Sequence, residues 1–278
     1  TLCVRLVPAG NGARGSLGHL RREEINLPLG ENGLHQPSIA IPQSLIEVGD
    51  QSAAESHCQE IVFGTLDVVV LIGNQYMPYY HGAILELLIK AGIGDDVRVI
   101  KGLDWLLSMR QDDGGWIVPV QAVPSRMRTS EMWLGMPVPP NRALPHAHLA
   151  TGMALRAFAA HPAYRTCPEV LAAGQALKNR LFQSDKYNDR KAVSYWLKFQ
   201  FPFWWTSLLT ALDTLFWLDF DKHDPDIARG LYWFITNQSP DGLWETGYGS
   251  GKKAEENRCW VGLAVCRILK HFLEDKVR

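Results

Sequence analysis

One phrase of this sequence occurs twice, in residues 101–116 and again in residues 229–244. Each copy reads basic–Gly, then an aromatic residue, an apolar run, Gln, a short acidic turn and Gly-x-Trp. Self-similarity at long spacing constrains the architecture strongly, because it indicates that one structural unit was copied. We therefore predict a repeated helical unit that ends in a tight glycine turn, which returns the chain beneath an indole.

The residue types of the phrase have physical roles at the end of a helix. Gln111 and Gln238 can bond free backbone groups there, and glycine permits the positive φ of a tight turn. Trp116 and Trp244 can cover the helix terminus with a large apolar face. The phrase is therefore a signature of fold and not of catalysis.

This phrase resembles the QW repeat of the squalene/oxidosqualene (terpene) cyclase and protein prenyltransferase superfamily. The copies differ slightly, since one extra residue precedes Gln111. Members of that superfamily are α/α toroids, so the resemblance implies an all-α fold, a partial or closed α/α barrel of helix-pair repeats. It also implies an isoprenoid-handling activity with an apolar, aromatic-lined central cavity.

Apolar periodicity places the expected helices in two groups. Segments that are apolar on nearly every face are expected as buried inner helices, near residues 80–92, 147–160, 204–218 and 258–272. Amphipathic segments are expected as outer helices, at residues 95–110, 168–182 and 225–237. We assign residues 64–278 to this repeat domain and residues 1–63 to an irregular segment packed on it, with a short helix around residues 44–63.

Composition narrows the class of protein. The 278 residues carry 28 basic and 29 acidic side chains, which gives no electrostatic footprint for nucleic acid. Five scattered cysteines without a CxxC pair favour a reducing compartment, so we expect a cytoplasmic protein. We expect no transmembrane segment, and a peripheral membrane contact stays open.

Aromatic density gives the first set of candidate site residues. Aromatic faces stabilise carbocations through the ring quadrupole, and isoprenoid cyclases line their cavities with them. The alternative is that these side chains are ordinary core. The candidate binding residues for a hydrophobic small-molecule ligand are Tyr79, Tyr80, His81, Trp133, His148, Tyr195, Trp196, Lys198, Phe201, Phe203, Trp204 and Trp205.

Two acids in the middle of helical segments are the candidate catalytic residues. The Asp-x-Asp-Asp motif of class II terpene cyclases and the Asp-Asp-x-x-Asp motif of class I enzymes do not occur in this sequence. Glu86 and Asp213 could be proton donors with a raised pKa, or members of buried salt bridges. Positions 206, 209, 213 and 216 would share one helical face, which would turn Asp213 toward a cavity.

The metal site of the prenyltransferase branch is only partly represented. That branch binds zinc through Asp, Cys and His, and here Asn257 replaces the acid two residues before Cys259. His146 and His148 do not share a helical face at a spacing of two, so capping or loop hydrogen bonds explain them better. We expect no cofactor, with zinc or magnesium left open.

A long connection and three arginines complete the candidates. Residues 117–145 are rich in proline, and a connection of this length is usually functional or disordered. Arg126, Arg128 and Arg142 are either a diphosphate clamp or ordinary solvated surface. The leading hypothesis is an isoprenoid cyclase or prenyltransferase-like protein. The alternatives are a non-catalytic toroid scaffold and a carbohydrate-active α/α barrel, which would need paired carboxylates such as Glu86 and Asp213.

Overall fold

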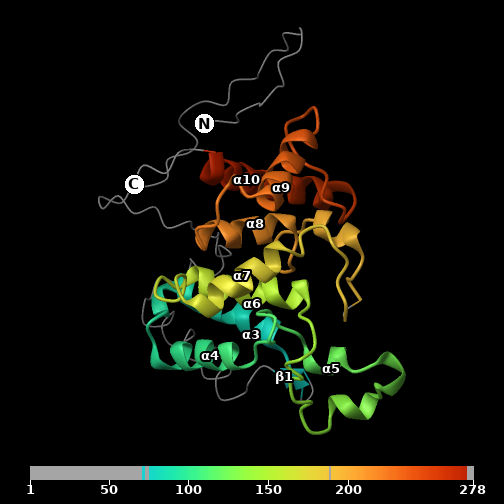
Figure 1. The fold of residues 1–278 in the computed structure, drawn as a ribbon. Coiled ribbons are helices and arrows are strands. Elements are labelled where there is room, and N and C mark those ends of the chain that lie inside the picture. The colour runs from blue at the N-terminus through green and yellow to red at the C-terminus, as the bar shows by residue number, and fades with distance from the viewer. Residues whose placement is uncertain (1–70, 73–74, 188, 274–278) are drawn as a thin grey trace, which may run out of the picture. The chain divides into compact units, whose positions relative to one another are not determined.

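The computed structural model describes residues 71–72, 75–187 and 189–273, in which helices are the main regular structure (Figure 1). Strand is limited, in these residues, to β1 (Leu71–Ile72), which pairs antiparallel with β2 (Gln75–Tyr76). The predicted all-α class is therefore confirmed for the described part of the chain. The irregular segment 1–63 and its short helix lie outside the described residues.

The contacts among the helices that follow β2 divide these helices into two groups, and Figure 1 shows them stacked from α4 to α10. One group holds the predicted inner helices, which pack on one another in chain order: α3 (Pro78–Leu88), α6 (His148–Ala160), α8 (Leu208–Trp217) and α10 (Gly251–Leu273). The other helices are α4 (Val97–Ser108), α7 (Pro168–Lys178) and α9 (Pro225–Thr236). Helix α4 packs on α3 and α6, helix α7 packs on α6 and α8, and helix α9 packs on α8.

Burial follows this grouping. Every residue of α6 is buried except Arg156 and Ala160, as expected for a helix with neighbours on all sides. In contrast, α4 buries a single stripe of residues, Val99, Gly102, Leu103 and Leu106. None of the helices in the described ranges is long and apolar enough to cross a bilayer.

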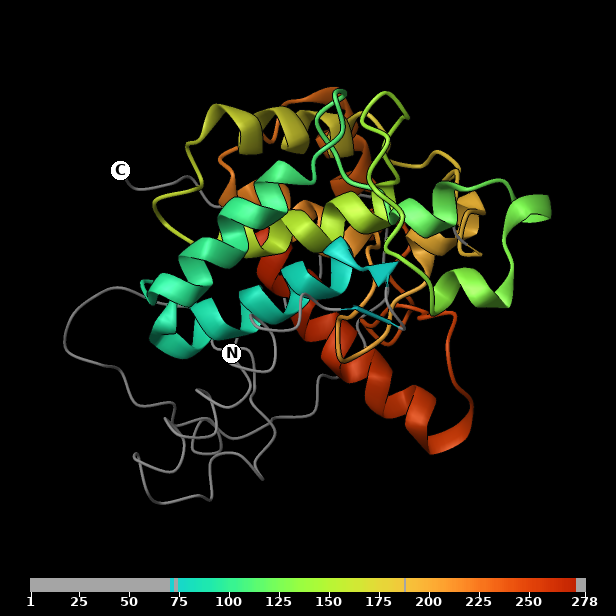
Figure 2. The same ribbon diagram turned by 90° about the horizontal axis from the view of Figure 1, so that it is seen from below.

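Short helical turns occupy the connections. They are η1 (Ile89–Ile93), a π-helical turn that continues α3, α5 (Pro119–Ala122), η2 (Ser125–Met127), η3 (Ser130–Trp133) and η4 (Val193–Leu197). The predicted long connection between α4 and α6 thus contains local structure. It projects from the helices in both views (Figures 1 and 2).

The two copies of the repeated phrase have the same local geometry. The indole Nε1 of Trp116 donates to the Leu106 carbonyl at 2.7 Å, and that of Trp244 donates to the Phe234 carbonyl at 2.7 Å. Each acceptor lies in the last turn of its helix, α4 or α9, where carbonyls lack helical partners. The predicted cover of a helix end by an indole is therefore confirmed in both copies.

The glutamines of the phrase do not bond the helix ends as expected. The amide of Gln111 donates to the carbonyls of Asn141 and Leu144, at 2.6 and 2.9 Å, and so holds the chain before α6. The amide of Gln238 donates to Gly242 at 2.9 Å within its own turn. Gly242 has a φ of 85°, which glycine adopts readily.

Two inner helices differ from their predicted bounds. Helix α8 begins at Leu208 and not at residue 204, because Ser207 caps it and exchanges hydrogen bonds with Thr210. The indoles of Trp204 and Trp205 therefore precede the helix. Helix α10 begins already at Gly251 and exposes Leu263, so it is amphipathic and not apolar all round.

Helices α3 and α6 approach each other closely at Gly82. A Cβ added at Gly82 would lie 2.6 Å from the Cα of Ala154 and 2.9 Å from the Met153 carbonyl oxygen. Only a residue without a side chain permits this approach of two backbones. The contact fixes the spacing of the first two inner helices, and with it the position of the residues that begin α3.

Candidate functional site

Four of the predicted aromatic residues meet at the start of α3 and in the segment before α8. The ring centroids of Tyr79 and Tyr80 are 4.1 Å apart, and that of Tyr80 lies 5.5 Å from Trp204 and 6.4 Å from Trp205. Tyr79 is buried and the other three are half-buried. Burial, with the adjoining Tyr80, raises the pKa of Tyr79 and keeps its hydroxyl protonated. We call these four residues the aromatic cluster.

Two cations adjoin the aromatic cluster. The guanidinium carbon of Arg190 lies 4.5 Å from the ring centroid of Trp205 and 5.5 Å from that of Tyr195. The ammonium nitrogen of Lys198 lies 4.6 Å from the Tyr195 centroid and 5.9 Å from that of Tyr248. All four distances suit attraction between a cation and the face of a ring.

These cations are held by rings and a hydroxyl, not by carboxylates. Arg190 donates one hydrogen bond to the Tyr248 hydroxyl at 2.8 Å. Among the described residues, no carboxylate forms an ion pair with Arg190 or Lys198. Because a cation on an aromatic face keeps its full charge, this group attracts anions. We call Arg190, Tyr195, Lys198 and Tyr248 the cation–aromatic group.

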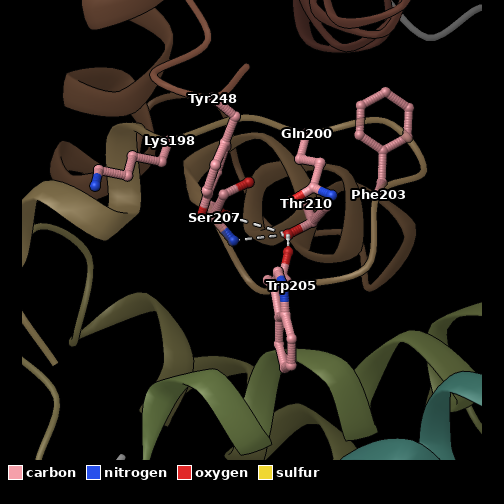
Figure 3. Close-up of a pocket in the computed structure, with 7 residues that line it drawn as sticks. All are labelled: Lys198, Gln200, Phe203, Trp205, Ser207, Thr210 and Tyr248. Atoms are coloured by element: carbon pink, nitrogen blue, oxygen red, sulfur yellow. Dashed lines mark hydrogen bonds between the residues drawn. The ribbon is translucent and has the colours of Figure 1, made fainter. Parts of the chain in front are cut away.

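A small recess joins the cluster to this group (Figure 3). Its lining is polar and aromatic, and comprises Lys198, Gln200, Phe203, Trp205, Ser207, Thr210 and Tyr248. The free volume is about 10 Å³, which is room for about one water. Among these described lining residues there is no carboxylate, imidazole or thiol, so the recess offers hydrogen bonds and positive charge but no acid–base pair.

A buried ion-pair network holds the segment that carries the tryptophans. Arg156 of α6 lies 2.7 Å from a carboxylate oxygen of Glu86 and donates to the backbone carbonyls of Phe203 and Trp204. The other Glu86 oxygen lies 2.5 Å from Lys90. Burial acts to raise the pKa of Glu86, but the charges and hydrogen bonds of Arg156 and Lys90 outweigh it and hold this pKa below its ordinary value.

The hypothesis of a raised pKa at Glu86 is therefore wrong. A proton donor must hold its proton near the working pH, and two cations keep the Glu86 carboxyl ionised. Its role in the structure is to position Arg156, and through Arg156 the two tryptophans of the aromatic cluster.

Asp213 lies between two inner helices. Its carboxylate lies 3.0 Å from Arg267 of α10. Of the two roles considered for Asp213, proton donor or member of a salt bridge, this contact fits the salt bridge. Phe216 from the same expected stripe stacks on His271 at 4.5 Å, so the stripe faces α10. Thr206 lies before the helix and donates to the Leu149 carbonyl at 2.7 Å. Glu86 and Asp213 belong to different helix interfaces and do not form a pair of facing carboxylates.

Several predicted binding residues lie apart from the aromatic cluster. His81 points to α4, where its Nε2 is 3.2 Å from the Gly102 carbonyl and its ring is 4.6 Å from that of Trp105. Burial lowers the pKa of His81 to about 4. Phe201 stacks on Trp260 at 4.7 Å, and Trp133 is half-buried in the connection between α4 and α6.

His148 forms a second group at the start of α6. Its ring stacks on Trp196 with centroids 4.3 Å apart, and Asp185 accepts from the backbone N–H groups of His148 and Leu149 at 3.1 and 3.0 Å. Burial lowers the pKa of His148 despite the Asp185 charge. The Asp185 carboxylate therefore accepts hydrogen bonds from the free N–H groups at the amino end of α6.

The residues considered for zinc have other partners. His146 Nδ1 lies 2.9 Å from Asp113, which fits the predicted loop hydrogen bonds. Asn257 accepts from the Phe201 N–H at 2.6 Å and donates to the Phe199 carbonyl at 3.2 Å, so it pins the aromatic segment. Within the described ranges, no three histidine, cysteine, aspartate or glutamate side chains lie together as metal ligands would.

Arg156, Arg190 and Tyr248 were missed as functional residues by the sequence analysis. Arg156 had a usable signal, because it is the one ionised residue between Leu149 and Ala160 of α6. Arg190 and Tyr248 lie in irregular segments 58 residues apart. No periodic pattern links such segments, and only the fold brings them together.

A comparison with protein-family models, with curated proteins and with solved structures found no match for this chain.

Proposed function

We propose that this domain is a partial α/α toroid that binds an amphipathic isoprenoid-type ligand with an anionic head, as its resemblance to terpene cyclases and prenyltransferases implies. One observation carries the proposal. Arg190 and Lys198 have no carboxylate partners in the described residues and lie on aromatic faces beside an aromatic cluster. Such a site suits an apolar chain that ends in negative charge.

The positions of the helix ends support the same ligand class. Helices α3 and α8 begin at Pro78 and Leu208, next to the aromatic cluster. The amino ends of helices carry partial positive charge, which favours a nearby anion. Arg190 and Lys198 add two full charges to this end of the inner helices.

The toroid is supported by the order of the helices. Helices α3, α6, α8 and α10 pack in sequence, and α4, α7 and α9 cover them from outside. Both copies of the repeated phrase end α4 and α9 with the same indole bond. A curved array of helix pairs follows from repeating such a unit.

We assign binding and leave the reaction open. The described lining of the recess holds no acid that could protonate a double bond, and Glu86 and Asp213 are both paired with arginines. An enzyme of this class would need a donor that reaches the ligand once it is bound.

A fluorescence titration tests the ligand class, because Trp204 and Trp205 lie in the proposed site. Farnesyl diphosphate should perturb tryptophan emission at lower concentration than either farnesol or inorganic diphosphate, since only farnesyl diphosphate engages both the rings and the cations. Equal responses to farnesol and farnesyl diphosphate would remove the anionic head from the proposal. No response to any of the three would overturn it.

The second candidate is a non-catalytic scaffold. It is favoured by the small free volume of the recess, about 10 Å³, and by rings of the aromatic cluster that pack on one another. A scaffold predicts no response in the same titration. The carbohydrate alternative has less support, because Glu86 and Asp213 lie in different helix interfaces.

A further inference from the structure

The connection between α4 and α6 exposes several large apolar side chains. Residues 123–145, which we call the projecting loop, extend away from the helices in both ribbon views (Figures 1 and 2). Met127 is 58% exposed, Leu134 74% and Met136 89%. Scattered apolar side chains on a surface are normal, but several on one projection indicate a contact surface.

The projecting loop is held in shape at its base. Gln75 is buried, and its amide nitrogen donates to the carbonyls of Met132, at 2.5 Å, and Met136, at 3.2 Å. Its amide oxygen accepts from the Val138 N–H at 2.8 Å. One buried glutamine therefore fixes the backbone of the segment that carries Leu134 and Met136.

Cations surround the base of the projecting loop. A groove of about 500 Å³ lies between the start of the loop and residues 186–191, and its lining includes Arg128, Lys186 and Lys191. Arg126 is exposed and lies between the lining residues Ser125 and Arg128 in the sequence. None of these four cations has an ion pair with a described carboxylate. One acid, Asp189, also lines the groove, and Glu131 lies nearby in sequence. The positive charge is therefore in excess.

We propose that the projecting loop is a contact with the surface of an anionic lipid bilayer. Met127, Leu134 and Met136 would enter the boundary between headgroups and acyl chains, where buried apolar area gives the affinity. Arg126, Arg128, Lys186 and Lys191 would lie at the headgroups, where each basic residue adds about 1 kcal/mol of attraction. This proposal is independent of the proposed ligand.

A lipid surface fits this geometry better than a protein partner. The apolar side chains lie on a projection and not in a groove, whereas peptides are usually held in grooves or on strand edges. The concave part of the surface is the cationic groove, which suits a phosphate headgroup. Exposed apolar side chains and nearby cations together match the two signals that stable peripheral binding requires.

Co-sedimentation of the full chain with vesicles tests the proposal. The protein should pellet with vesicles of phosphatidylcholine mixed with phosphatidylserine, and weakly or not at all with phosphatidylcholine alone. Replacing Leu134 and Met136 together by serine should reduce the bound fraction at any salt concentration. Replacing Arg126 and Arg128 by glutamine should weaken binding about fivefold per residue at low salt, and less at high salt.

The matched control is Leu263→Ser, because Leu263 is 64% exposed on α10, outside the projecting loop. This variant should bind vesicles as the wild type does. The proposal is overturned if the wild-type chain ignores anionic vesicles, or if L263S and the loop variant lose binding equally. It is also overturned if light scattering finds a dimer that the loop variant abolishes, since the loop would then contact a second copy of the chain.

Discussion

At Glu86 a buried carboxylate holds two cations, and its effect on stability should depend on pH. The pKa of Glu86 is lowered from 4.5 in the fold, so its contribution is present above that pH and is lost as the pH falls further. Glu86→Gln should destabilise the protein by about 3 kcal/mol at neutral pH, because Arg156 is left buried with one partner fewer. Urea unfolding at several pH values measures this difference, which should shrink below pH 4.5.

A constant difference between wild type and E86Q across this range would mean that the carboxylate is not ionised in the fold. The proton-donor role, wrong on the present geometry, would then be open again. Asp213→Asn is the comparison variant, since Asp213 faces a single arginine at 3.0 Å and is less buried than Glu86.

At His81 the pH dependence has the same direction as at Glu86 but a different cause, because burial here disfavours the charged form. Burial lowers the pKa from 6.5 to about 4, so between these values the unfolded chain binds a proton that the folded chain does not. Stability should therefore fall as the pH drops through this range, by about 1.4 kcal/mol per pH unit for one histidine. His81→Gln should remove that part of the slope, which denaturant titrations between pH 7 and 5 would measure. An unchanged slope would show that folding does not lower the pKa of His81.

At the scale of the element, the two repeated units predict equal responses to the same substitution. Trp116→Phe and Trp244→Phe each remove an indole N–H that satisfies a helix-end carbonyl at 2.7 Å. Each variant should lose about 1–3 kcal/mol of unfolding free energy, the usual cost of a buried group left without its partner. Trp260→Phe is the control, because Trp260 is half-buried and stacks on Phe201. Unequal losses in the first two would contradict a common role.

The contact between α3 and α6 depends on one missing side chain. Gly82→Ala would place a methyl group 2.6 Å from the Cα of Ala154, and relief of this overlap should cost about 1–3 kcal/mol. Gly94→Ala is the matched control, since its added Cβ would lie no closer than 3.4 Å to a neighbour. Thermal unfolding of the two variants makes the comparison, and equal melting temperatures would refute the close approach.

The elements differ in how far sequence could predict them. The continuous apolar pattern predicted α6 almost to the residue. The same criterion failed at Trp204 and Trp205, because large aromatic side chains continue an apolar pattern even where the chain is extended. Ser207 was the available signal for the true start of α8, since serine is a preferred helix cap. The predicted start of α10, near residue 258, came after the observed start at Gly251, because the first turns of this helix are polar.

At the scale of the whole molecule, the packing of the helices explains why only part of the candidate site could be predicted from the sequence. Tyr79, Tyr80, Trp204 and Trp205 come from two segments that were both singled out, and the contact of α3 and α8 with α6 brings them together. Lys198 was singled out as well, but Arg190, the other cation of the site, was not, because its position depends on tertiary packing. Local pattern carries little information on such contacts between irregular segments.

In the whole fold, the two acids that were candidate proton donors have structural roles. Glu86 pairs across α3 and α6, and Asp213 pairs across α8 and α10. Helix α3 is therefore linked to α6, and α8 to α10, by an ion pair as well as by apolar contact. This arrangement leaves the positive charge of Arg190 and Lys198 uncompensated by the described carboxylates, which is the basis of the proposed anion site.

The most direct test of that site is a calorimetric titration of farnesyl diphosphate into Lys198→Gln and a matched Lys101→Gln variant. Lys101 is exposed on α4, away from the cation–aromatic group. Loss of a charge-assisted contact should weaken binding by about tenfold or more in K198Q, while K101Q should bind as the wild type does. Equal affinities in all three proteins would contradict the assignment of Lys198, and with it the anion site at the start of the inner helices.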